Sequence, residues 1–178
     1  TVGEDGASHQ SVEDIAIMRV IPNMTVIVPA DGIEARKVIE AVAKYKGPVY
    51  VRASRGKSPV ILDDSYNFEI GKGTVLNNGS DVSIIACGIM VPKALEAAGM
   101  LKKEGLSVRV INMSTIKPLD KDIIIKAARD TGGVVTAEEH SIIGGLGSAV
   151  AEVLAENCPV PMKRVGIEDK FGTSGDAD

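Results

Sequence analysis

The sequence is poor in aromatic residues: its 178 residues include 3 tyrosines, 2 phenylalanines and no tryptophan. Proteins that bind single-stranded nucleic acids stack the bases on aromatic side chains, and this chain has too few for such a platform. Acidic residues outnumber basic ones by 24 to 20, and no run of cations is longer than the pair Lys102 and Lys103. Because nucleic-acid binding depends on clustered positive charge, we expect no nucleic-acid partner.

Long apolar runs are also missing. The longest apolar stretch, residues 82–91, is interrupted by Ser83 and Gly88 and is much shorter than the roughly 18 residues of a membrane span. No charged start followed by an apolar run and a cleavage site argues for secretion. We therefore expect a cytoplasmic protein without a membrane partner. The two cysteines, Cys87 and Cys158, lie beside apolar residues and are expected to be buried thiols rather than a disulfide.

Metal ligands are scarce in the sequence. The two histidines, His9 and His140, lie far apart, and there is no Cys-x-x-Cys motif, so a zinc site has no local ligand set. Glu138 and Glu139 precede His140, but adjacent residues of a strand point to opposite faces of the sheet. We expect no metal site in this chain and a structural or interface role for these three residues.

The sequence does contain a regular alternation of strand and helix patterns. β-branched and apolar runs predict strands, and apolar residues three and four apart predict helices. Two helix caps are expected, at Ser11 with Asp14 as a weak variant of the capping box, and at Asp31 with Glu34. The predicted elements are a helix from Ser11 to before Pro22, a strand at 25–28, a helix at 31–43, strands at 49–53 and 82–86, a helix at 92–104, a strand at 108–112, a helix at 120–130, a strand at 134–137, a helix at 147–157 and a strand at 162–167.

This alternation is typical of parallel sheets covered by helices. We expect an α/β protein of two doubly wound domains with mainly parallel sheets, the first of them incomplete. The pattern loosens over residues 63–80 and ends in the turn-rich stretch 77–80, which indicates a linker. The predicted domains are residues 1–75 and 76–178.

Two polar loops are candidate sites, because ligands of open α/β folds gather beyond the carboxyl ends of the strands. The loop 3–10 combines an acid, a hydroxyl, an imidazole and an amide, and Asp with His can bind sugar hydroxyls and move protons; a solvated loop explains it equally well. Residues 52–57 hold three cations and a glycine, which suits phosphate. Pairing of these cations with nearby acids such as Asp63 and Asp64 is the alternative.

A third loop, Gly144, Gly145, Leu146 and Gly147, precedes a predicted helix and is similar to a dinucleotide fingerprint. The last glycine of that fingerprint would be at position 150, which is a valine, and the loop follows the third strand of its domain rather than the first. Close packing of the helix explains these glycines better. No Gly-Asp-Gly followed by an Asn is present to hold a magnesium diphosphate.

Several of these segments together resemble the C-terminal half of transketolases. They are Gly3-Glu4-Asp5-Gly6-Ala7-Ser8-His9-Gln10, Pro29-Ala30-Asp31, Ser54-Arg55 and Phe171-Gly172-Thr173-Ser174-Gly175. The order and spacing match along essentially the whole chain. Deoxyxylulose phosphate synthases and the β components of 2-oxo acid dehydrogenases share the fold but usually lack this combination.

The resemblance implies the later part of a pyrimidine-binding domain followed by the transketolase C-terminal domain. It implies that Asp5 contacts a donor-sugar hydroxyl, that His9 lies near the reacting carbons as the catalytic residue and binds substrate, and that Arg55 grips the sugar phosphate. The family usually has Pro and Thr where this chain has Ala7 and Ser8; the hydroxyl is kept, and the turn is loosened.

The resemblance also implies thiamine diphosphate and Mg²⁺ as cofactors of the complete enzyme. The family's glutamate that protonates the aminopyrimidine, its stacking aromatics and its magnesium-diphosphate motif would lie upstream of Thr1. We therefore expect this chain alone to bind no cofactor and to be inactive, as a fragment or a separate subunit. The implied partners are an N-terminal transketolase domain or subunit, phosphorylated sugars and a second copy in a homodimer. A non-catalytic dimerisation or regulatory module is the alternative.

Overall fold

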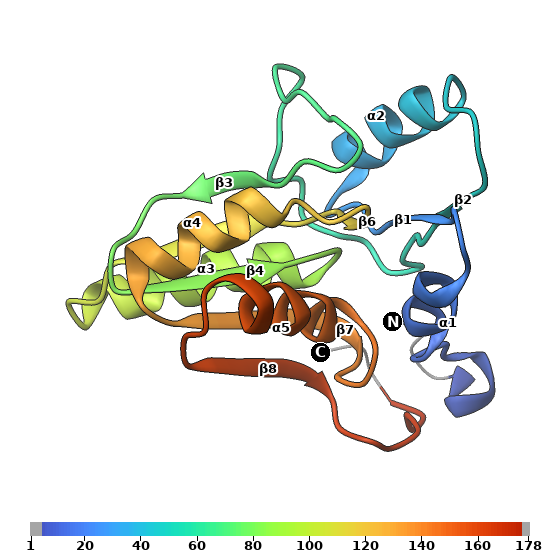
Figure 1. The fold of residues 1–178 in the computed structure, drawn as a ribbon. Helices are drawn as coiled ribbons and strands as arrows, with labels where there is room; N and C mark the ends of the chain where they lie inside the picture. Colours follow the sequence, from blue (N-terminus) through green and yellow to red (C-terminus); the bar gives the residue numbers. More distant parts are fainter. Residues whose placement is uncertain (1–4, 176–178) are drawn as a thin grey trace.

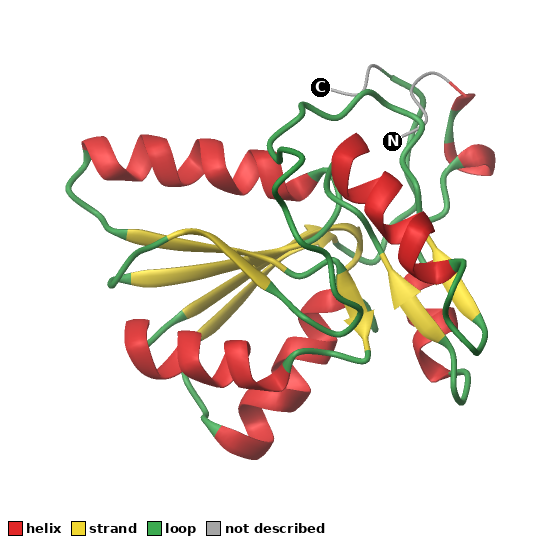
Figure 2. Cartoon of the chain, turned by 90° about the horizontal axis from the view of Figure 1, so that it is seen from above, coloured by secondary structure: helices red, strands yellow, loops and turns green. Residues whose placement is uncertain are grey.

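In the computed structural model, which describes residues 5–175, a five-stranded sheet carries helices on both faces, and a three-stranded sheet lies beside it (Figures 1 and 2). The expected α/β class with mainly parallel strands is confirmed. Two of the strands, β3 and β6, run antiparallel to their neighbours. No helix of residues 5–175 is long and apolar enough to cross a bilayer.

The larger sheet has the strand order β3-β5-β4-β7-β8. Its strands are β3 (Thr74–Asn77), β4 (Val82–Ala86), β5 (Val108–Asn112), β7 (Val134–Ser141) and β8 (Met162–Ile167). Its helices are α3 (Met90–Lys103), α4 (Lys121–Thr131) and α5 (Leu146–Asn157). Strand β3 falls in the stretch expected to be a linker, so that expectation was wrong for residues 74–77. The backbone there pairs with β5.

Alternation along β4 explains why helices cover both faces. Ile84 and Ala86 are buried in a cluster with apolar residues of α3, whereas Ile85 between them is buried in a second cluster with residues of α4 and α5. Successive strand side chains point to opposite faces, so an uninterrupted apolar strand needs cover on both. The sheet is therefore a buried central layer.

The smaller sheet has the order β2-β1-β6. Its strands are β1 (Thr25–Ile27), β2 (Val49–Val51) and β6 (Thr115–Lys117), and the first part of the chain adds the 3₁₀ turn η2 (Ala7–His9) and the helices α1 (Asp14–Val20) and α2 (Gly32–Val42). Strand β6 follows the larger sheet's β5 in sequence but pairs with β1, so the chain returns to the first sheet. The boundary near residue 75 stays a prediction.

Of the two expected helix caps, one is correct. The carboxylate of Asp31 accepts a hydrogen bond from Glu34 N at 2.9 Å, and the Glu34 carboxylate accepts one from Ala30 N at 2.7 Å, as in a capping box. The cap expected at Ser11 was wrong, because α1 begins at Asp14 with Glu13 before it. The Ser11 carbonyl instead accepts a hydrogen bond from Arg52.

The glycine loop before α5 is built for close packing. The buried Glu138 carboxylate of β7 accepts hydrogen bonds from Leu146 N at 2.7 Å and Gly147 N at 2.8 Å, at the first turn of α5. A Cβ atom at Gly145 would lie 2.0 Å from Glu138 Oε2, and one at Gly147 would lie 2.9 Å from the side chain of Arg164. The packing interpretation of these glycines is confirmed by these distances.

We expect Gly145→Ala to destabilise the protein by about 1–3 kcal/mol, because the new methyl group must displace a carboxylate that is buried and hydrogen-bonded. The matched control is Gly99→Ala in α3, where a Cβ would meet no atom within 4 Å and the loss of backbone freedom in the unfolded chain should add about 0.5–1 kcal/mol. Urea unfolding of both variants measures the two changes. Equal stability of the two variants would contradict the packing role of Gly145.

Candidate functional site

The structure brings two of the three predicted site residues into contact. Arg55, in the loop after β2, forms an ion pair with Asp5, in the loop before η2. Their side chains remain 68% and 40% exposed. The alternative for this basic cluster, pairing with acids, is correct in that Arg55 pairs with Asp5 and Arg52 with Asp14. The acids named as examples, Asp63 and Asp64, are not the partners of these two arginines, and Asp64 pairs with Arg36. An exposed cation and carboxylate held side by side can bind a phosphate and a hydroxyl of one ligand.

His9, the third predicted residue, lies at the end of η2. Its Nδ1 is 3.1 Å from Ser8 Oγ, so within the described residues its side-chain hydrogen bond is to its neighbour and not to Asp5 or Arg55. The hydroxyl of Ser8, which the sequence keeps where the family usually has Thr, thus orients the imidazole. The assignment of catalytic and substrate-binding roles to Asp5, His9 and Arg55 stays a prediction.

The two ends of the described chain meet at this site. Gln10 Nε2 donates a hydrogen bond to the carbonyl of Thr173 at 3.2 Å. A Cβ atom at Gly172 would overlap Gln10 Oε1, and one at Gly6 would lie 2.6 Å from Ser174 Oγ. The closing Phe-Gly-Thr-Ser-Gly segment therefore packs against the loop of Asp5 and His9, which explains why both segments are rich in glycine.

Arg52 has a different environment from Arg55, although both belong to the same basic cluster. Its side chain is 14% exposed, and Nε donates to Asp14 Oδ2 at 2.9 Å while Nη2 donates to the Ser11 carbonyl at 2.9 Å. Nη1 lies 3.5 Å from Glu139 Oε2. The three nitrogens of this guanidinium are already engaged, so Arg52 is not available to a phosphate.

A small cavity adjoins Arg52 at the carboxyl ends of the central strands. It is lined by Val28, Pro29, Arg52, Ser54, Cys87, Gly88, Ile89 and Glu139, and its free volume of about 10 Å³ leaves room for about one water molecule. Burial raises the pKa of the Cys87 thiol well above its usual range, and the Glu138 carboxylate adds to this rise. Cys87 is buried as expected, Cys158 is half-buried, and both are free thiols.

The three-residue sequence Glu138, Glu139 and His140 does not form a ligand cluster. Glu138 holds the first turn of α5, and burial raises the pKa of its carboxyl although the two backbone hydrogen bonds oppose the rise. His140 Nδ1 lies 2.7 Å from its neighbour's carbonyl, and its Nε2 accepts from Ala16 N at 3.3 Å. Among residues 5–175, no group of three His, Cys, Asp or Glu side chains could hold a metal ion.

The described residues therefore fit a polyhydroxy anion and not a diphosphate with its metal. Arg55 carries a positive charge of the kind that suits a phosphate, and Asp5, Ser8 and His9 carry acceptors and donors of the kind that suit hydroxyl groups. No set of carboxylates for Mg²⁺ accompanies them within residues 5–175.

These features define an α/β protein with two packed sheets and a polar site where loops from distant parts of the chain meet. Residues 1–60 match the transketolase pyrimidine binding domain, and residues 71–178 match the transketolase C-terminal domain. The chain belongs to the transketolase family, whose enzymes depend on thiamine diphosphate.

Three relatives place the chain within this family. It is 55% identical to a putative transketolase C-terminal section of Methanocaldococcus jannaschii, over 100% of this chain and 56% of that protein. It is 43% identical to 1-deoxy-D-xylulose-5-phosphate synthase of Heliobacterium modesticaldum, over 98% of this chain and 27% of the synthase. A solved structure described as a split gene transketolase, inactive β4 tetramer, has 54% identity and a TM-score of 0.90, over 92% of this chain and 55% of that chain.

The chain thus spans about half the length of the transketolase section that it matches. The sequence analysis proposed Asp5, His9 and Arg55 as site residues but missed the cluster around Arg52. Asp14 was noted only as a weak capping residue, and Glu139 only as a poor metal ligand. The available signal was an arginine that follows a tyrosine by two residues at the end of a predicted strand.

Tyr50 belongs to this cluster, since its hydroxyl donates to Asp14 Oδ2 at 2.7 Å. Burial, followed by the hydrogen bond to Asp14, raises the pKa of Tyr50 from 10.0 to about 12. Because folding raises this pKa, the contribution to stability is complete below about pH 10 and is lost as the pH rises through about 12. We expect the phenolate absorbance that Tyr50→Phe removes to develop near pH 12. A midpoint near pH 10 would show that the hydrogen bond is absent in solution.

Proposed function

We propose that this chain is the C-terminal portion or subunit of a transketolase, which transfers a two-carbon ketol unit between phosphorylated sugars with thiamine diphosphate and Mg²⁺. The observation that carries the proposal is the contact of Asp5 with Arg55, which combines a hydroxyl acceptor and a phosphate-binding cation in a single exposed site. Family membership supports the reaction class.

In this proposal each residue acts on the sugar rather than on the cofactor. The Arg55 guanidinium holds the terminal phosphate by charge-assisted hydrogen bonds. Asp5, once its ion pair with Arg55 is opened by that phosphate, accepts a hydrogen bond from a donor hydroxyl. His9 lies on the same loop, and its imidazole is suited to hold or move a proton at a substrate oxygen near neutral pH.

An N-terminal domain or subunit completes the enzyme in this proposal. The exposure of the Asp5 and Arg55 side chains, 40% and 68%, leaves the other side of a substrate uncovered by residues 5–175. A second copy of the chain would pair with it through both domains as a homodimer, in the cytoplasm; the similar solved structure is described as an inactive tetramer of β chains. The pentose phosphate pathway is the expected metabolic setting.

A related second function is favoured by one observation. The match to 1-deoxy-D-xylulose-5-phosphate synthase covers 98% of this chain, so the same scaffold serves a synthase in another protein. Asp5 and Arg55 side by side fit both, because both kinds of enzyme handle a phosphorylated sugar. Assay of the assembled enzyme with a sugar phosphate donor, against pyruvate as donor, separates the two functions.

The first test of the proposal concerns the chain alone. We expect no micromolar binding of thiamine diphosphate with Mg²⁺ by calorimetric titration, because the described residues lack a set of metal ligands. Addition of an N-terminal partner subunit should restore binding. Micromolar binding by the isolated chain would refute the division of the site between two parts.

Arg55→Ala in the assembled enzyme should weaken the binding of phosphorylated substrates about tenfold to a hundredfold, because a hydrogen bond to a charged group contributes about 1.5–3 kcal/mol to affinity. The loss should appear in KM if the contact is the same in ground and transition states. Hydroxypyruvate as donor, with an acceptor that carries no phosphate, should be nearly unaffected. Equal losses with both donors would mean that Arg55 supports the loop only.

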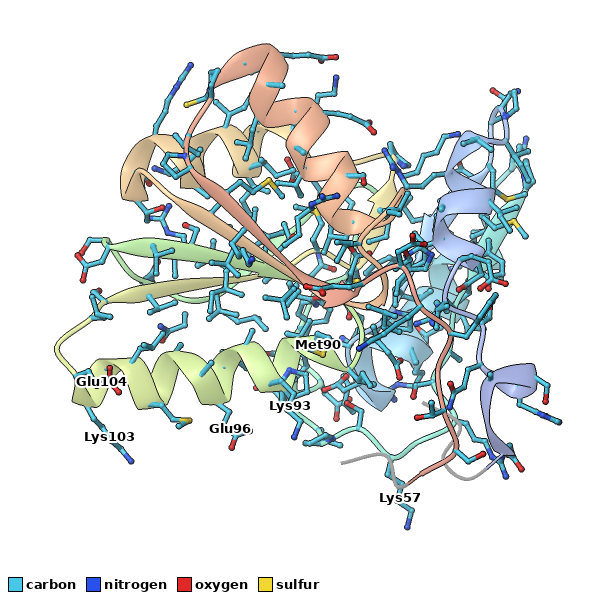
Figure 3. The ribbon with its side chains drawn as sticks, turned by 90° about the horizontal axis from the view of Figure 1, so that it is seen from below. Lys57, Met90, Lys93, Glu96, Lys103 and Glu104 are labelled. Carbon is cyan, nitrogen blue, oxygen red and sulfur yellow. The ribbon has the colours of Figure 1, made fainter. Side chains whose placement is uncertain are left out.

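Two controls accompany this variant. Lys57 belongs to the same loop, and Figure 3 shows its side chain pointing away from the body of the molecule, so Lys57→Ala should leave KM unchanged. Asp5→Ala should weaken the binding of donor sugars, whose hydroxyl Asp5 contacts in this proposal, and should spare hydroxypyruvate, whichever substrate carries the phosphate. A loss in Lys57→Ala equal to that in Arg55→Ala would point to the net charge of the loop rather than to a specific contact.

A further inference from the structure

We propose that Arg52 is a positioning residue. Through Arg52, the larger sheet fixes the position of the loop of Asp5 and His9 relative to Arg55. The inference rests on the proposed function and assigns a role to the contacts between the two sheets. Arg52 directly follows β2 and precedes Arg55 by three residues, and its side chain contacts the segment that leaves the loop of Asp5 and His9.

The first set of contacts joins Arg52 to the exit of the candidate loop. Nη2 donates to the carbonyl of Ser11, one residue after Gln10, at 2.9 Å, and Nε donates to Asp14 at the start of α1 at 2.9 Å. Tyr50, two residues before Arg52, donates to the same oxygen of Asp14 at 2.7 Å. The end of β2 and the start of α1 are thereby held in one fixed relation.

The second set of contacts joins the same segment to β7 of the larger sheet. The carbonyl of Val12 accepts from Ser141 N at 2.8 Å, and Ala16 N donates to His140 Nε2 at 3.3 Å. Glu139, between Glu138 and His140 on β7, lies 3.5 Å from Arg52 Nη1. Arg52 therefore contacts the loop exit, α1 and β7 at once.

Arg19 strengthens this attachment one helical turn further on. Its guanidinium donates to the carbonyl of Gly144 at 2.7 Å and pairs with Glu152 of α5 at 2.8 Å. A Cβ at Gly144 would lie 2.6 Å from the methyl group of Ala16. Helix α1 is thus held against the loop before α5. The loop with Asp5 and His9, which precedes α1 in the chain, is therefore attached to a fixed helix.

Only an arginine can make this junction. A planar guanidinium presents donors in several directions, whereas a lysine ammonium at the same place is a single charged point. The side chain of Arg52 is 14% exposed and that of Asp14 is 10% exposed, and Asp14 Oδ1 has no hydrogen-bond partner among the described residues. The Asp14 carboxylate therefore depends on Arg52 and Tyr50.

The experiment compares Arg52→Lys with Arg109→Lys. Arg109 is equally buried, with 14% of its side chain exposed, and it pairs with Asp130 at 2.8 Å at the amino end of β5. Amide hydrogen exchange of the chain reports on the two hydrogen bonds between segments, at Ala16 and Ser141. We expect exchange at these amides to accelerate at least tenfold in Arg52→Lys, with the amides of α3 unchanged, and to keep the wild-type rate in Arg109→Lys.

In the assembled enzyme, Arg52→Lys should lower kcat/KM about tenfold to a hundredfold with sugar phosphates and with hydroxypyruvate alike, because a small misplacement of reacting groups costs rate by such factors. The affinity for thiamine diphosphate should stay within about twofold of wild type. Arg109→Lys should retain kcat/KM.

Several outcomes would overturn the proposal. Exchange at Ala16 and Ser141 at the wild-type rate in Arg52→Lys would overturn it. Equal acceleration of exchange in α3, or failure of this variant to fold, would also overturn it, because either would mark Arg52 as a general structural residue. Unchanged kcat/KM in an assembled enzyme whose wild type is active would also overturn it. If the wild-type assembly transfers no ketol unit, the proposed function fails, and the exchange measurement still decides the positioning role.

Discussion

The relation between the two sheets depends on Glu34, a fully buried carboxylate. It accepts hydrogen bonds from Ala30 N at 2.7 Å, from the Tyr66 hydroxyl at 2.7 Å and from Asn112 Nδ2 at 2.9 Å. These donors come from the end of the first sheet, from the connection after β2 and from β5. A buried carboxylate is costly unless its hydrogen bonds are satisfied, and only this arrangement of the three segments satisfies them. Burial, followed by the negative charge of Glu34, raises the pKa of Tyr66, so the phenol stays a donor.

Asp31 extends the same constraint toward the site. One oxygen caps α2 through Glu34 N, and the other accepts from Ile61 N at 2.8 Å and Leu62 N at 2.9 Å. The chain that leaves β2 with Arg55 is therefore held at both ends, by Arg52 next to the strand and by the hydrogen bond of Asp31 to Ile61, six residues after Arg55. Between these two points Ser58 Oγ also donates to the carbonyl of Ala30 at 2.8 Å, and these attachments keep the Arg55 cation near Asp5.

Features that depend on local interactions could be predicted from the sequence, whereas features that depend on contacts between distant residues could not. The bounds of β4, β5 and β8 agree with the predicted strands, because an apolar run between turn residues is a local signal. Strands β3 and β6 were missed, since four-residue and three-residue stretches form strands only by pairing with partners far away in sequence. At the candidate site, Asp5, His9 and Arg55 were predicted through a family motif, and the structure brings Asp5 and Arg55 into contact. Arg52 and Glu139 were read separately, because nothing local indicates that residues 87 positions apart share an ion pair.

The same distinction explains how the candidate site is divided. The groups suited to a sugar phosphate lie on loops. Contacts of the α1 segment with β7 and of the closing segment with Gln10 hold these loops on the side that faces the rest of the protein. Their exposed sides have no cover among residues 5–175. A catalytic site needs its reacting groups held in position and also needs water to be excluded. Here the groups are held in position, but residues 5–175 do not exclude water from them. Under the proposed function, the chain presents preorganised substrate contacts to its partner, and the free-energy cost of ordering those loops falls on folding rather than on assembly.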